Sequence, residues 1–477
     1  MSSRKVAIIG AGAAGLANAK AQIDVGNDVT IYEVGSQLAG MWQFMNDNGR
    51  SSAYSSLHIN TPRPATNFED FDFVTEPAMF PSHAEMARYL NDYADHFGLR
   101  ERVKFNAEVT KVEPTAPESG ATRWSLTTAD GFTKIYDTVI VATGHLTDPV
   151  LPSLFDDFTG RLIHSHEYKE PKGFRDERVL VVGSGNSAVD IAADMATTAS
   201  HASIAIRSPE MISPKVFLGR PLGVVESWFR KSWLPADANL IVRRLATRLV
   251  HGKMETWGIE TPKGRTHPIS QATLIQHIAY NRVTVRPGVV STSGKTVTFS
   301  DGSTEEFDAI IAATGYTLSF PFLSESIVSV DGSGSLNLYG RAVAPRWPGL
   351  YFAGYFNTNG LSNPRMMEYQ ARWIAKIESG QVLVPSVEDM LIEVAELKRW
   401  LAKRYPAGPR YAFELEPKPY LEFIKTEEAQ VTVRRTASAL DAAGMWAQRG
   451  VTRRTDAHLI EKTAVRSAES DIAAVQP

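Results

Sequence analysis

The fold is decided by the run Lys5-Val6-Ala7-Ile8-Ile9-Gly10-Ala11-Gly12-Ala13-Ala14-Gly15 near the start of the chain. Its first half is a short apolar strand and its second half is a glycine-rich turn, after which residues 13–25 continue with helical spacing. A second strand is expected over residues 28–33. Strand, glycine turn, helix and strand in this order predict the opening βαβ unit of a parallel sheet.

The three glycines have the spacing of a dinucleotide-binding fingerprint. Gly10 permits the tight turn, Gly12 lets the backbone approach a pyrophosphate, and Gly15 lets the helix pack closely on the strand. The N-terminus of the helix offers N–H groups and a positive dipole to the phosphates. Glu33 ends the second strand, where its carboxylate can accept hydrogen bonds from ribose hydroxyls. An acidic ribose ligand suits FAD, so we expect FAD here.

The same pattern recurs in the middle of the chain as Gly183-Ser184-Gly185-Asn186-Ser187-Ala188, between an expected strand and an expected helix. Here Ala188 takes the place of the third glycine. The strand that follows ends in Arg207, and an arginine at this position fits the 2′-phosphate of NADPH, which an acid would repel. The alternative is a solvated surface arginine. We predict NADPH, in preference to NADH, at this second site.

Composition excludes several classes of protein. The 477 residues include 50 Lys and Arg against 53 Asp and Glu, a net charge of −3, which indicates no nucleic-acid partner. The chain has no cysteine, so it has no disulfide, no thiolate metal site and no redox-active cysteine pair to receive electrons from a flavin. The electron acceptor must then be oxygen, a quinone or a separate protein, and we predict no metal site.

The chain also lacks a membrane-spanning pattern, because no run approaches the roughly 18 apolar residues that cross a bilayer. The first residues lead straight into the apolar strand without the features of a signal peptide. We therefore expect a cytoplasmic protein with no transmembrane segment.

A third motif lies between the two fingerprints and reads Phe158-Thr159-Gly160-Arg161-Leu162-Ile163-His164-Ser165-His166-Glu167-Tyr168. Alone, it predicts a turn glycine and a packed histidine. It resembles the Phe-x-Gly-x-x-x-His-x-x-x-(Tyr/Trp) signature of class B flavin monooxygenases, the group of flavin-containing and Baeyer–Villiger monooxygenases. The resemblance covers about residues 4–425 and extends to Gly40-Met41-Trp42, to two Ala-Thr-Gly turns that end at Gly144 and Gly315, and to Glu368-Tyr369-Gln370-Ala371-Arg372-Trp373.

This resemblance implies an α/β protein with two Rossmann-like dinucleotide-binding domains, the NADPH domain inserted into the FAD domain. We expect residues 1–165 to form the first part of the FAD domain, 166–320 the NADPH domain, 321–425 the second part of the FAD domain, and 426–477 a loosely attached tail. Residues 213–268 are expected to form helices over an opening.

The resemblance also implies roles for single residues. Gly40, Trp42, Gly144, Gly315 and Gly354 belong to the expected cofactor-binding turns, with Trp42 and Gly354 lining the FAD site. His164 is expected at the hinge between domains, where it affects the position of the nicotinamide. Asn60 matches a position beside the reactive edge of the flavin, where its amide could hydrogen-bond a flavin peroxide. The alternative for Asn60 is an asparagine that satisfies a loop turn.

The activity implied is an NADPH- and oxygen-dependent monooxygenase that forms a flavin hydroperoxide and oxygenates an amine nitrogen or sulfide sulfur of a small organic molecule. Tyr168 in the last slot of the signature, where Baeyer–Villiger enzymes usually carry Trp, favours this branch. Ketone oxygenation stays open. So does oxidative decarboxylation of a 2-oxo acid, because residues 252–262 look somewhat like a segment of auxin-forming enzymes. An NADPH oxidase or quinone reductase and a degenerate flavin-binding scaffold are further alternatives. The substrate and the oligomeric state, including a homodimer, stay open.

Overall fold

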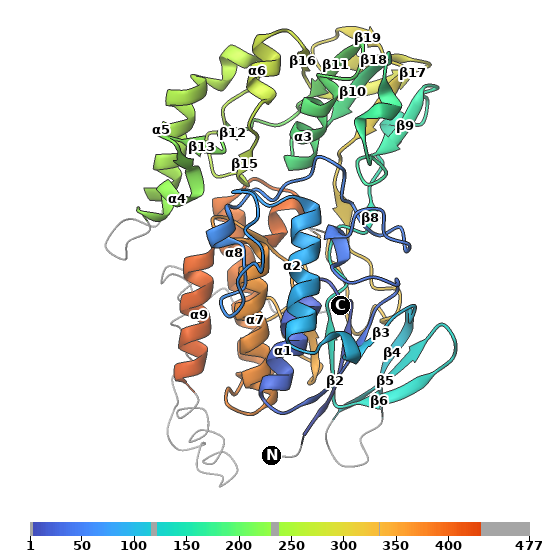
Figure 1. Ribbon diagram of the computed structural model, residues 1–477, viewed down its shortest axis with the longest axis vertical. Helices are drawn as coiled ribbons and strands as arrows, with labels where there is room; N and C mark the ends of the chain where they lie inside the picture. Colours follow the sequence, from blue (N-terminus) through green and yellow to red (C-terminus); the bar gives the residue numbers. More distant parts are fainter. Residues whose placement is uncertain (1–2, 116–121, 230–237, 333, 431–477) are drawn as a thin grey trace.

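The structure, a computed structural model, describes residues 3–115, 122–229, 238–332 and 334–430. The chain forms two lobes, one above the other in Figure 1. The lower lobe is built on a parallel sheet whose five strands lie in the order β22 (Leu350–Phe352), β7 (Thr138–Val141), β1 (Lys5–Ile9), β2 (Asp28–Tyr32) and β3 (Val103–Lys104). The strand that precedes the first fingerprint is therefore central and buried.

The upper lobe repeats this plan with a second parallel sheet. Its strands lie in the order β16 (Val283–Arg286), β11 (His201–Ala205), β10 (Arg178–Val182), β20 (Ala309–Ala312) and β9 (Arg161–His164). Again the strand before the fingerprint, β10, is central. The two Rossmann-like units and the insertion of one into the other agree with the sequence-based expectation.

Each unit also carries an antiparallel three-stranded sheet, inserted before β7 in the lower lobe and before β20 in the upper lobe. In the lower lobe the three strands are β4 (Val109–Thr115), β5 (Arg123–Thr128) and β6 (Thr133–Tyr136). In the upper lobe they are β17 (Val289–Ser293), β18 (Thr296–Phe299) and β19 (Thr304–Glu306). Residues 103–112 do not form one strand, because the chain forms β3, turns, and starts β4 in a separate sheet.

Helices cover the lower sheet. The alanine-rich α1 (Ala13–Asp24) is buried against α7 (Asn363–Glu378), with α2 (His83–His96) beside it, as Figure 1 shows. Ser82 caps α2 with a capping box, because its hydroxyl accepts from the Glu85 N–H while the Glu85 carboxylate accepts from the Ser82 N–H. The helices α8 (Val387–Arg404) and α9 (Pro417–Ala429) follow.

The expected tail does not begin at residue 426, because α9 continues to Ala429; residues 431–477 lie outside the described residues. A short parallel pair, β23 (Asn357–Thr358) and β24 (Glu414–Leu415), ties the segment after β22 to the segment before α9. The C-terminal part of the chain thus returns to the first sheet through β22 and covers it through α7.

The two connections between the lobes pair with each other. β8 (Asp148–Pro149) and β21 (Tyr316–Thr317) form an antiparallel two-stranded ribbon at the junction. β9 follows β8 and lies in the second sheet, beside β20. The second unit therefore begins before the expected boundary at residue 165, and His164, the last residue of β9, belongs to the upper lobe.

The upper lobe also contains α3 (Asn186–Met195), α6 (Leu274–Ala279) and a subdomain built from the described residues between 212 and 270. The subdomain comprises β12 (Ile212–Ser213) paired with β15 (Ile269–Ser270), a hairpin of β13 (Val216–Phe217) and β14 (Arg220–Pro221), α4 (Leu222–Ser227) and α5 (Ala238–His251). The helices expected over residues 213–268 are thus present in the described part of this range.

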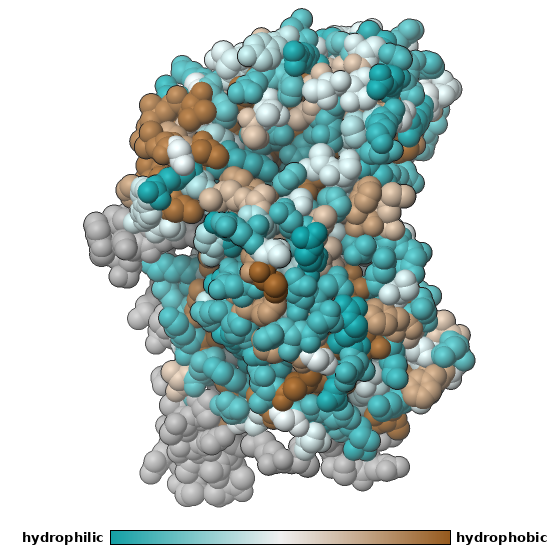
Figure 2. Space-filling view, viewed as in Figure 1, coloured by the Kyte–Doolittle hydropathy of each residue, from teal (hydrophilic) through white to brown (hydrophobic). Residues whose placement is uncertain are grey.

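Helix α5 turns its polar side toward the protein. Arg243 is buried and makes a bidentate ion pair with the fully buried Glu226 (2.5 and 2.7 Å), while Ile241, Leu245 and Leu249 on the other side are more than half exposed. Figure 2 shows the resulting apolar patch over α5. The apolar periodicity of this helix therefore marks its exposed face and not the core.

Candidate functional site

A cavity of about 520 Å³ lies between the lobes and opens on both fingerprints. Its size is within the usual range for ligand sites, about 300–1,000 Å³. It lies at the carboxyl ends of β1, β2 and β7, where ligands bind in open α/β sheets. Ten residues that the sequence singled out line it: Gly10, Gly12, Glu33, Gly40, Trp42, Asn60, Gly144, Asn186, Ser187 and Gly354.

The first fingerprint forms a cradle in which the glycines are sterically required. Gly10 has φ +107°, and a Cβ there would lie 2.5 Å from the Ala142 carbonyl oxygen. A Cβ on Gly15 would lie 1.9 Å from the Gly10 carbonyl oxygen. The first turn of α1 has no acidic residue and no side-chain cap, so its N–H groups stay available to an anion at the cavity wall. These features fit a pyrophosphate.

Glu33 is held at the wall of the cavity as a hydrogen-bond acceptor. It is 5 % exposed, and its carboxylate accepts from the Ala11 N–H (2.8 Å) and the Gly35 N–H (2.9 Å). Asn48 Nδ2 donates to the same group at 3.3 Å. Burial raises the pKa of Glu33, and the N–H donors oppose that shift. The carboxylate has further lone pairs, which suit it to a ribose hydroxyl.

Two asparagines present unpaired atoms in the cavity. Asn60 Oδ1 and Asn186 Oδ1 are buried and have no hydrogen-bond partner among the described residues, and both residues line the cavity. A buried polar group without a partner costs about 1–3 kcal/mol. Asn60 comes from the lower lobe and Asn186 from the first turn of α3 in the upper lobe. A ligand that fills the cavity would supply partners to both.

The second fingerprint repeats the geometry of the first. Gly183 has φ +139°, and a Cβ there would lie 2.5 Å from the Ala313 carbonyl oxygen, the counterpart of the Gly10 contact with Ala142. At Gly185 a Cβ would meet open space. The first turn of α3 also lacks an acid and a side-chain cap. These features fit a second pyrophosphate in the same way as those of the first cradle.

Arg207 lies two residues beyond the end of β11, beside this second cradle. It is exposed, its stem packs over Gly288, and the described residues include no ion-pair partner for it. A guanidinium left free in this way is available to a phosphate.

Seven of the singled-out residues do not line the cavity: Gly15, His164, Gly183, Gly185, Ala188, Arg207 and Gly315. Gly15 and Ala188 instead occupy the close contact between helix and strand in each unit.

His164 lies at the junction of the lobes. Its ring packs edge-on against Tyr316 of the connection β21 (5.1 Å), and Nδ1 accepts from the His166 N–H (3.0 Å). The proton of the neutral ring is therefore on Nε2, which is buried without a partner among the described residues. Burial lowers the pKa of His164 to about 4. The imidazole is neutral at pH 7.

Sequence reasoning missed the contacts that join the lobes beside the cavity. Tyr54 from the lower lobe donates to Asp190 of α3 (2.8 Å), Ser56 donates to Asp194 (2.5 Å), and Lys169 Nζ donates to the Ser51 carbonyl oxygen (2.7 Å). Burial raises the pKa of Asp190 to about 6. These residues lie in stretches without regular periodicity or on a helix whose polar positions carry no local signal, so their pairing arises only in the folded chain.

Other residues that line the cavity lie directly after the ends of parallel strands, a position that can be recognised in the sequence. His145 comes directly after the Ala142-Thr143-Gly144 turn, and its Nε2 lies 3.2 Å from Asn357 Oδ1. Asn357 and Asn363 follow β22, and the Asn363 side chain accepts from the Thr358 N–H (2.9 Å). Positions just after the carboxyl ends of parallel strands are the places where such side chains collect, so this signal was available in the sequence.

Two dinucleotide cradles that open on one cavity define a flavoprotein oxidoreductase dependent on a pyridine nucleotide. The family model described as "FMO-like: Flavin-binding monooxygenase-like" matches residues 3–433. Flavin-containing monooxygenase 5 of Oryctolagus cuniculus is 31 % identical over 436 residues, which covers 87 % of this chain and 80 % of that protein. Flavin-containing monooxygenase 1 of Mus musculus is 32 % identical over 419 residues, 83 % of this chain and 77 % of that protein. The chain therefore belongs to the flavin-binding monooxygenase family.

Solved structures agree with this assignment. S-allyl-L-cysteine S-oxygenase from Allium sativum is 25 % identical with a TM-score of 0.67, and the match covers 99 % of each chain. A cyclohexanone monooxygenase, 19 % identical, has a TM-score of 0.65 over 93 % of this chain and 99 % of the other, and shares the fold. Enzymes of this family are NADPH-dependent flavoprotein monooxygenases that use FAD, and the two cradles fit both cofactors.

Within the described residues, every helix is too short or too polar to span a bilayer. The same part of the chain contains no cluster of three or more His, Asp or Glu side chains that could hold a metal ion.

Proposed function

We propose that this monooxygenase oxygenates the sulfur or nitrogen of a small organic molecule, with FAD in the first cradle and NADPH in the second. The observation that carries the proposal is the cavity into which both cradles open, with the unpaired amide oxygens of Asn60 and Asn186 on its wall. Similarity to a garlic S-oxygenase over the whole chain supports sulfur as the oxygenated atom.

The residues of the first cradle would hold FAD. The N–H groups at the start of α1 face the pyrophosphate, Glu33 accepts from the adenosine ribose, and Gly354 and Trp42 line the wall of the cavity. Gly144 and Gly40 complete the turns around the cofactor. The bound FAD supplies the redox chemistry, which is acceptance of hydride from NADPH and activation of dioxygen.

The second cradle would orient NADPH toward the same cavity. The start of α3 receives the pyrophosphate, Arg207 pairs with the 2′-phosphate, and Asn186 and Ser187 lie on the cavity wall. His164 and Gly315 lie where the lobes join, so they affect how the two cradles face each other. Because His164 does not line the cavity, its influence on the nicotinamide would run through the junction of the lobes and not through direct contact.

Asn60 would hydrogen-bond the edge of the bound cofactor that lies in the cavity. Its loop lies on the lower lobe and faces the start of α3 across the cavity, so the two lobes enclose the reacting groups and limit the access of water. Loss of this hydrogen bond would raise the ratio of hydrogen peroxide to oxygenated product. The Asn60 amide therefore affects coupling more than cofactor binding.

Tyr168, the residue that favoured heteroatom oxidation, is 1 % exposed and is not one of the residues that line the cavity. Its hydroxyl donates to Asp194 (2.8 Å) and its ring packs on Tyr54. Its influence on substrate choice would therefore run through the packing of the lobes and not through direct contact. Ketone oxygenation and 2-oxo acid decarboxylation are outcomes that the substrate test distinguishes.

The test supplies NADPH and oxygen with methyl phenyl sulfide, N,N-dimethylaniline, cyclohexanone and a 2-oxo acid, and identifies products by mass spectrometry. We expect a sulfoxide or an N-oxide. A lactone or a decarboxylated acid as the main product would contradict the proposal, and hydrogen peroxide as the main product with every compound would indicate an oxidase.

The role of Asn60 is tested by Asn60→Leu, with Asn91→Leu on α2, away from the cavity, as the matched control. Loss of a hydrogen bond to a charged group is worth about 1.4 kcal/mol or more, so we expect the ratio of hydrogen peroxide to product to rise about tenfold. The control should keep the wild-type ratio. An unchanged ratio in Asn60→Leu would show that the amide does not act on the oxygenation step.

A further inference from the structure

Residues 57–72, which we call the Asn60 loop, have little regular structure of their own apart from a short 3-10 turn at Arg63–Ala65. The loop is closed internally, because the hydroxyls of Thr61 and Thr66 lie 2.9 Å apart and Thr66 also donates to the carbonyl oxygens of Thr61 and Pro62. Thr61 lines the cavity beside Asn60. The position of Thr66 is therefore coupled to that of Thr61, the neighbour of Asn60 in the chain.

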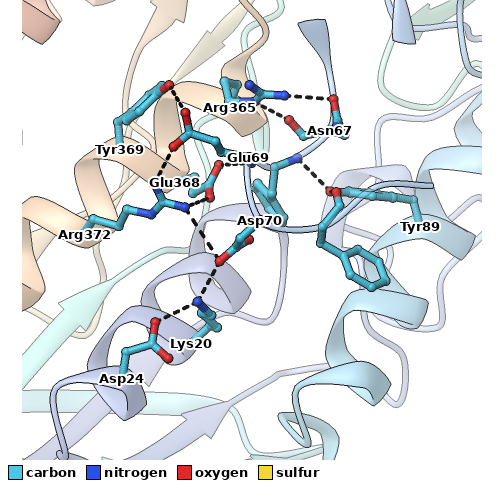
Figure 3. Close-up of polar contacts among 12 residues, drawn as sticks. Lys20, Asp24, Asn67, Glu69, Asp70, Tyr89, Arg365, Glu368, Tyr369 and Arg372 are labelled. Carbon is cyan, nitrogen blue, oxygen red and sulfur yellow. Dashed lines mark hydrogen bonds and ion pairs between the residues drawn. The ribbon is translucent and has the colours of Figure 1, made fainter. Parts of the chain in front are cut away.

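That position is set by helix α7, which is almost 300 residues away in the sequence. Ser362, the N-cap of α7, donates to the Thr66 carbonyl oxygen (3.2 Å). Arg365 in the first turn donates through Nε to the Asn67 carbonyl oxygen and through Nη2 to Asn67 Oδ1 (2.8 Å). Figure 3 shows this guanidinium directed at Asn67 from the start of α7.

The same helix also holds the later part of the loop. The Glu69 N–H donates to Glu368 (2.5 Å), and Arg372 bridges the carboxylates of Glu368 and Glu69 (2.5 and 2.6 Å), as Figure 3 shows. Asp70 pairs with Lys20 of α1 (2.6 Å). Most of these groups are partly exposed, whereas Thr66 and Asn67 are buried. The buried part of the loop is therefore held by Ser362 at Thr66 and by the charged Arg365 at Asn67.

Helix α7 reaches the opposite side of the cavity as well. Gln370, fully buried, accepts through Oε1 from the N–H of Gly354 (2.9 Å), the turn proposed to line the FAD site. Gln370 lies five residues after Arg365, which is about 7.5 Å along a helix. One rigid element therefore contacts the Asn60 loop with Arg365 and the Gly354 turn with Gln370.

We propose that Arg365 is a positioning residue that sets the distance between Asn60 and the flavin by clamping the Asn60 loop to α7. Arg365 does not line the cavity, so it touches neither cofactor nor substrate and acts through the loop. The planar guanidinium donates from two nitrogens in a fixed fork to a backbone carbonyl and a side-chain amide at once, and its charge strengthens both hydrogen bonds. This inference rests on the role proposed for Asn60.

The test compares Arg365→Gln with the wild-type FAD-loaded protein in two measurements. Hydrogen–deuterium exchange of the amides in residues 57–72 should be at least tenfold faster in the variant. With methyl phenyl sulfide, the ratio of hydrogen peroxide to sulfoxide should rise at least threefold, while FAD content and the rate of flavin bleaching by NADPH stay within twofold of wild type. Arg365→Lys should recover part of the coupling.

Lys376→Gln is the matched control, because Lys376 lies on the same helix and its ion pair with Glu428 (2.7 Å) leads away from the loop. It should change neither measurement. If Arg365→Gln fails to fold, Asn67→Ala removes the side-chain half of the same contact from the loop side and should give the same two changes. Unchanged exchange in residues 57–72, or a normal ratio despite faster exchange, would overturn the inference.

Asn60→Leu, measured in parallel, separates the two proposals. If Asn60→Leu raises the ratio and Arg365→Gln does not, only the positioning role is wrong. If Asn60→Leu keeps the wild-type ratio, the proposed role of Asn60 fails and the positioning role is overturned with it.

Discussion

The buried imidazole of His164 should make the protein sensitive to mild acid. Protonation would place a proton on Nδ1, where it would face the His166 N–H, a donor that already occupies that nitrogen. Burial lowers the pKa of His164 from 6.5 to about 4. In the unfolded chain the ring is protonated below about pH 6.5, whereas in the folded protein it stays neutral down to about pH 4.

The sign and size of the effect follow from this difference. Above pH 6.5 the ring is neutral in both the folded and the unfolded state, so its titration does not change the free energy of unfolding. As the pH falls, the unfolded state binds a proton that the folded state does not, so the free energy of unfolding decreases. The loss is about 2 kcal/mol at pH 5 and reaches about 3 kcal/mol below pH 4.

His164→Gln removes the titrating group and keeps a polar side chain of similar reach. The measurement is urea unfolding of the FAD-loaded protein at pH 7.5 and at pH 5. Between these two pH values the free energy of unfolding should decrease by about 2 kcal/mol less in the variant than in wild type. Selective ¹³C labelling of the eleven histidines gives a direct check, since the signal missing in the variant identifies His164. A His164 signal that titrates near pH 6.5, or parallel pH profiles of the two proteins, would refute the reasoning.

The other predictions concern the two cradles. Arg207→Ser should raise KM for NADPH at least tenfold and leave KM for NADH within twofold, because only NADPH carries the 2′-phosphate. Steady-state assays with both nucleotides test this, and equal changes in the two KM values would contradict the role of Arg207. Gly15→Ala should give colourless or insoluble protein, because its Cβ would lie 1.9 Å from a carbonyl oxygen, and a yellow soluble variant with normal FAD content would be inconsistent with the packing. Gly185→Ala, whose Cβ meets open space, should keep its fold and FAD while the Kd for NADP⁺ rises at least fivefold in a fluorescence titration; an unchanged Kd would place the pyrophosphate elsewhere.

Much of the fold could be read from the sequence because the fingerprints are local. Gly10 and Gly183 each need a backbone conformation that other residues rarely adopt, and each follows a short buried strand. Such requirements act within about thirty residues, so strand, turn and helix can be recognised without knowledge of the rest of the chain.

Predictions that needed contacts between distant segments were less successful. Strand β9 was placed in the first lobe, because nothing in Arg161–His164 indicates which sheet it joins; its pairing with β20, in the second sheet, decides that. The apolar periodicity of α5 could not show that this face is exposed, since the buried side of the helix is occupied by the ion pair of Arg243 with Glu226. The local sequence pattern does not predict ion-pair partners of this kind.

The sequence by itself therefore determined that the protein has two nucleotide cradles and which glycines build them, because steric rules for a tight turn act on neighbouring residues. Only the tertiary structure decided that both cradles share one cavity, that Asn60 faces it with an unpaired amide, and that Arg365 clamps the loop of Asn60 from almost 300 residues away. Hydrogen bonds and burial depend on which residues are close in space, and the separation of two residues along the sequence does not give their distance in the folded protein.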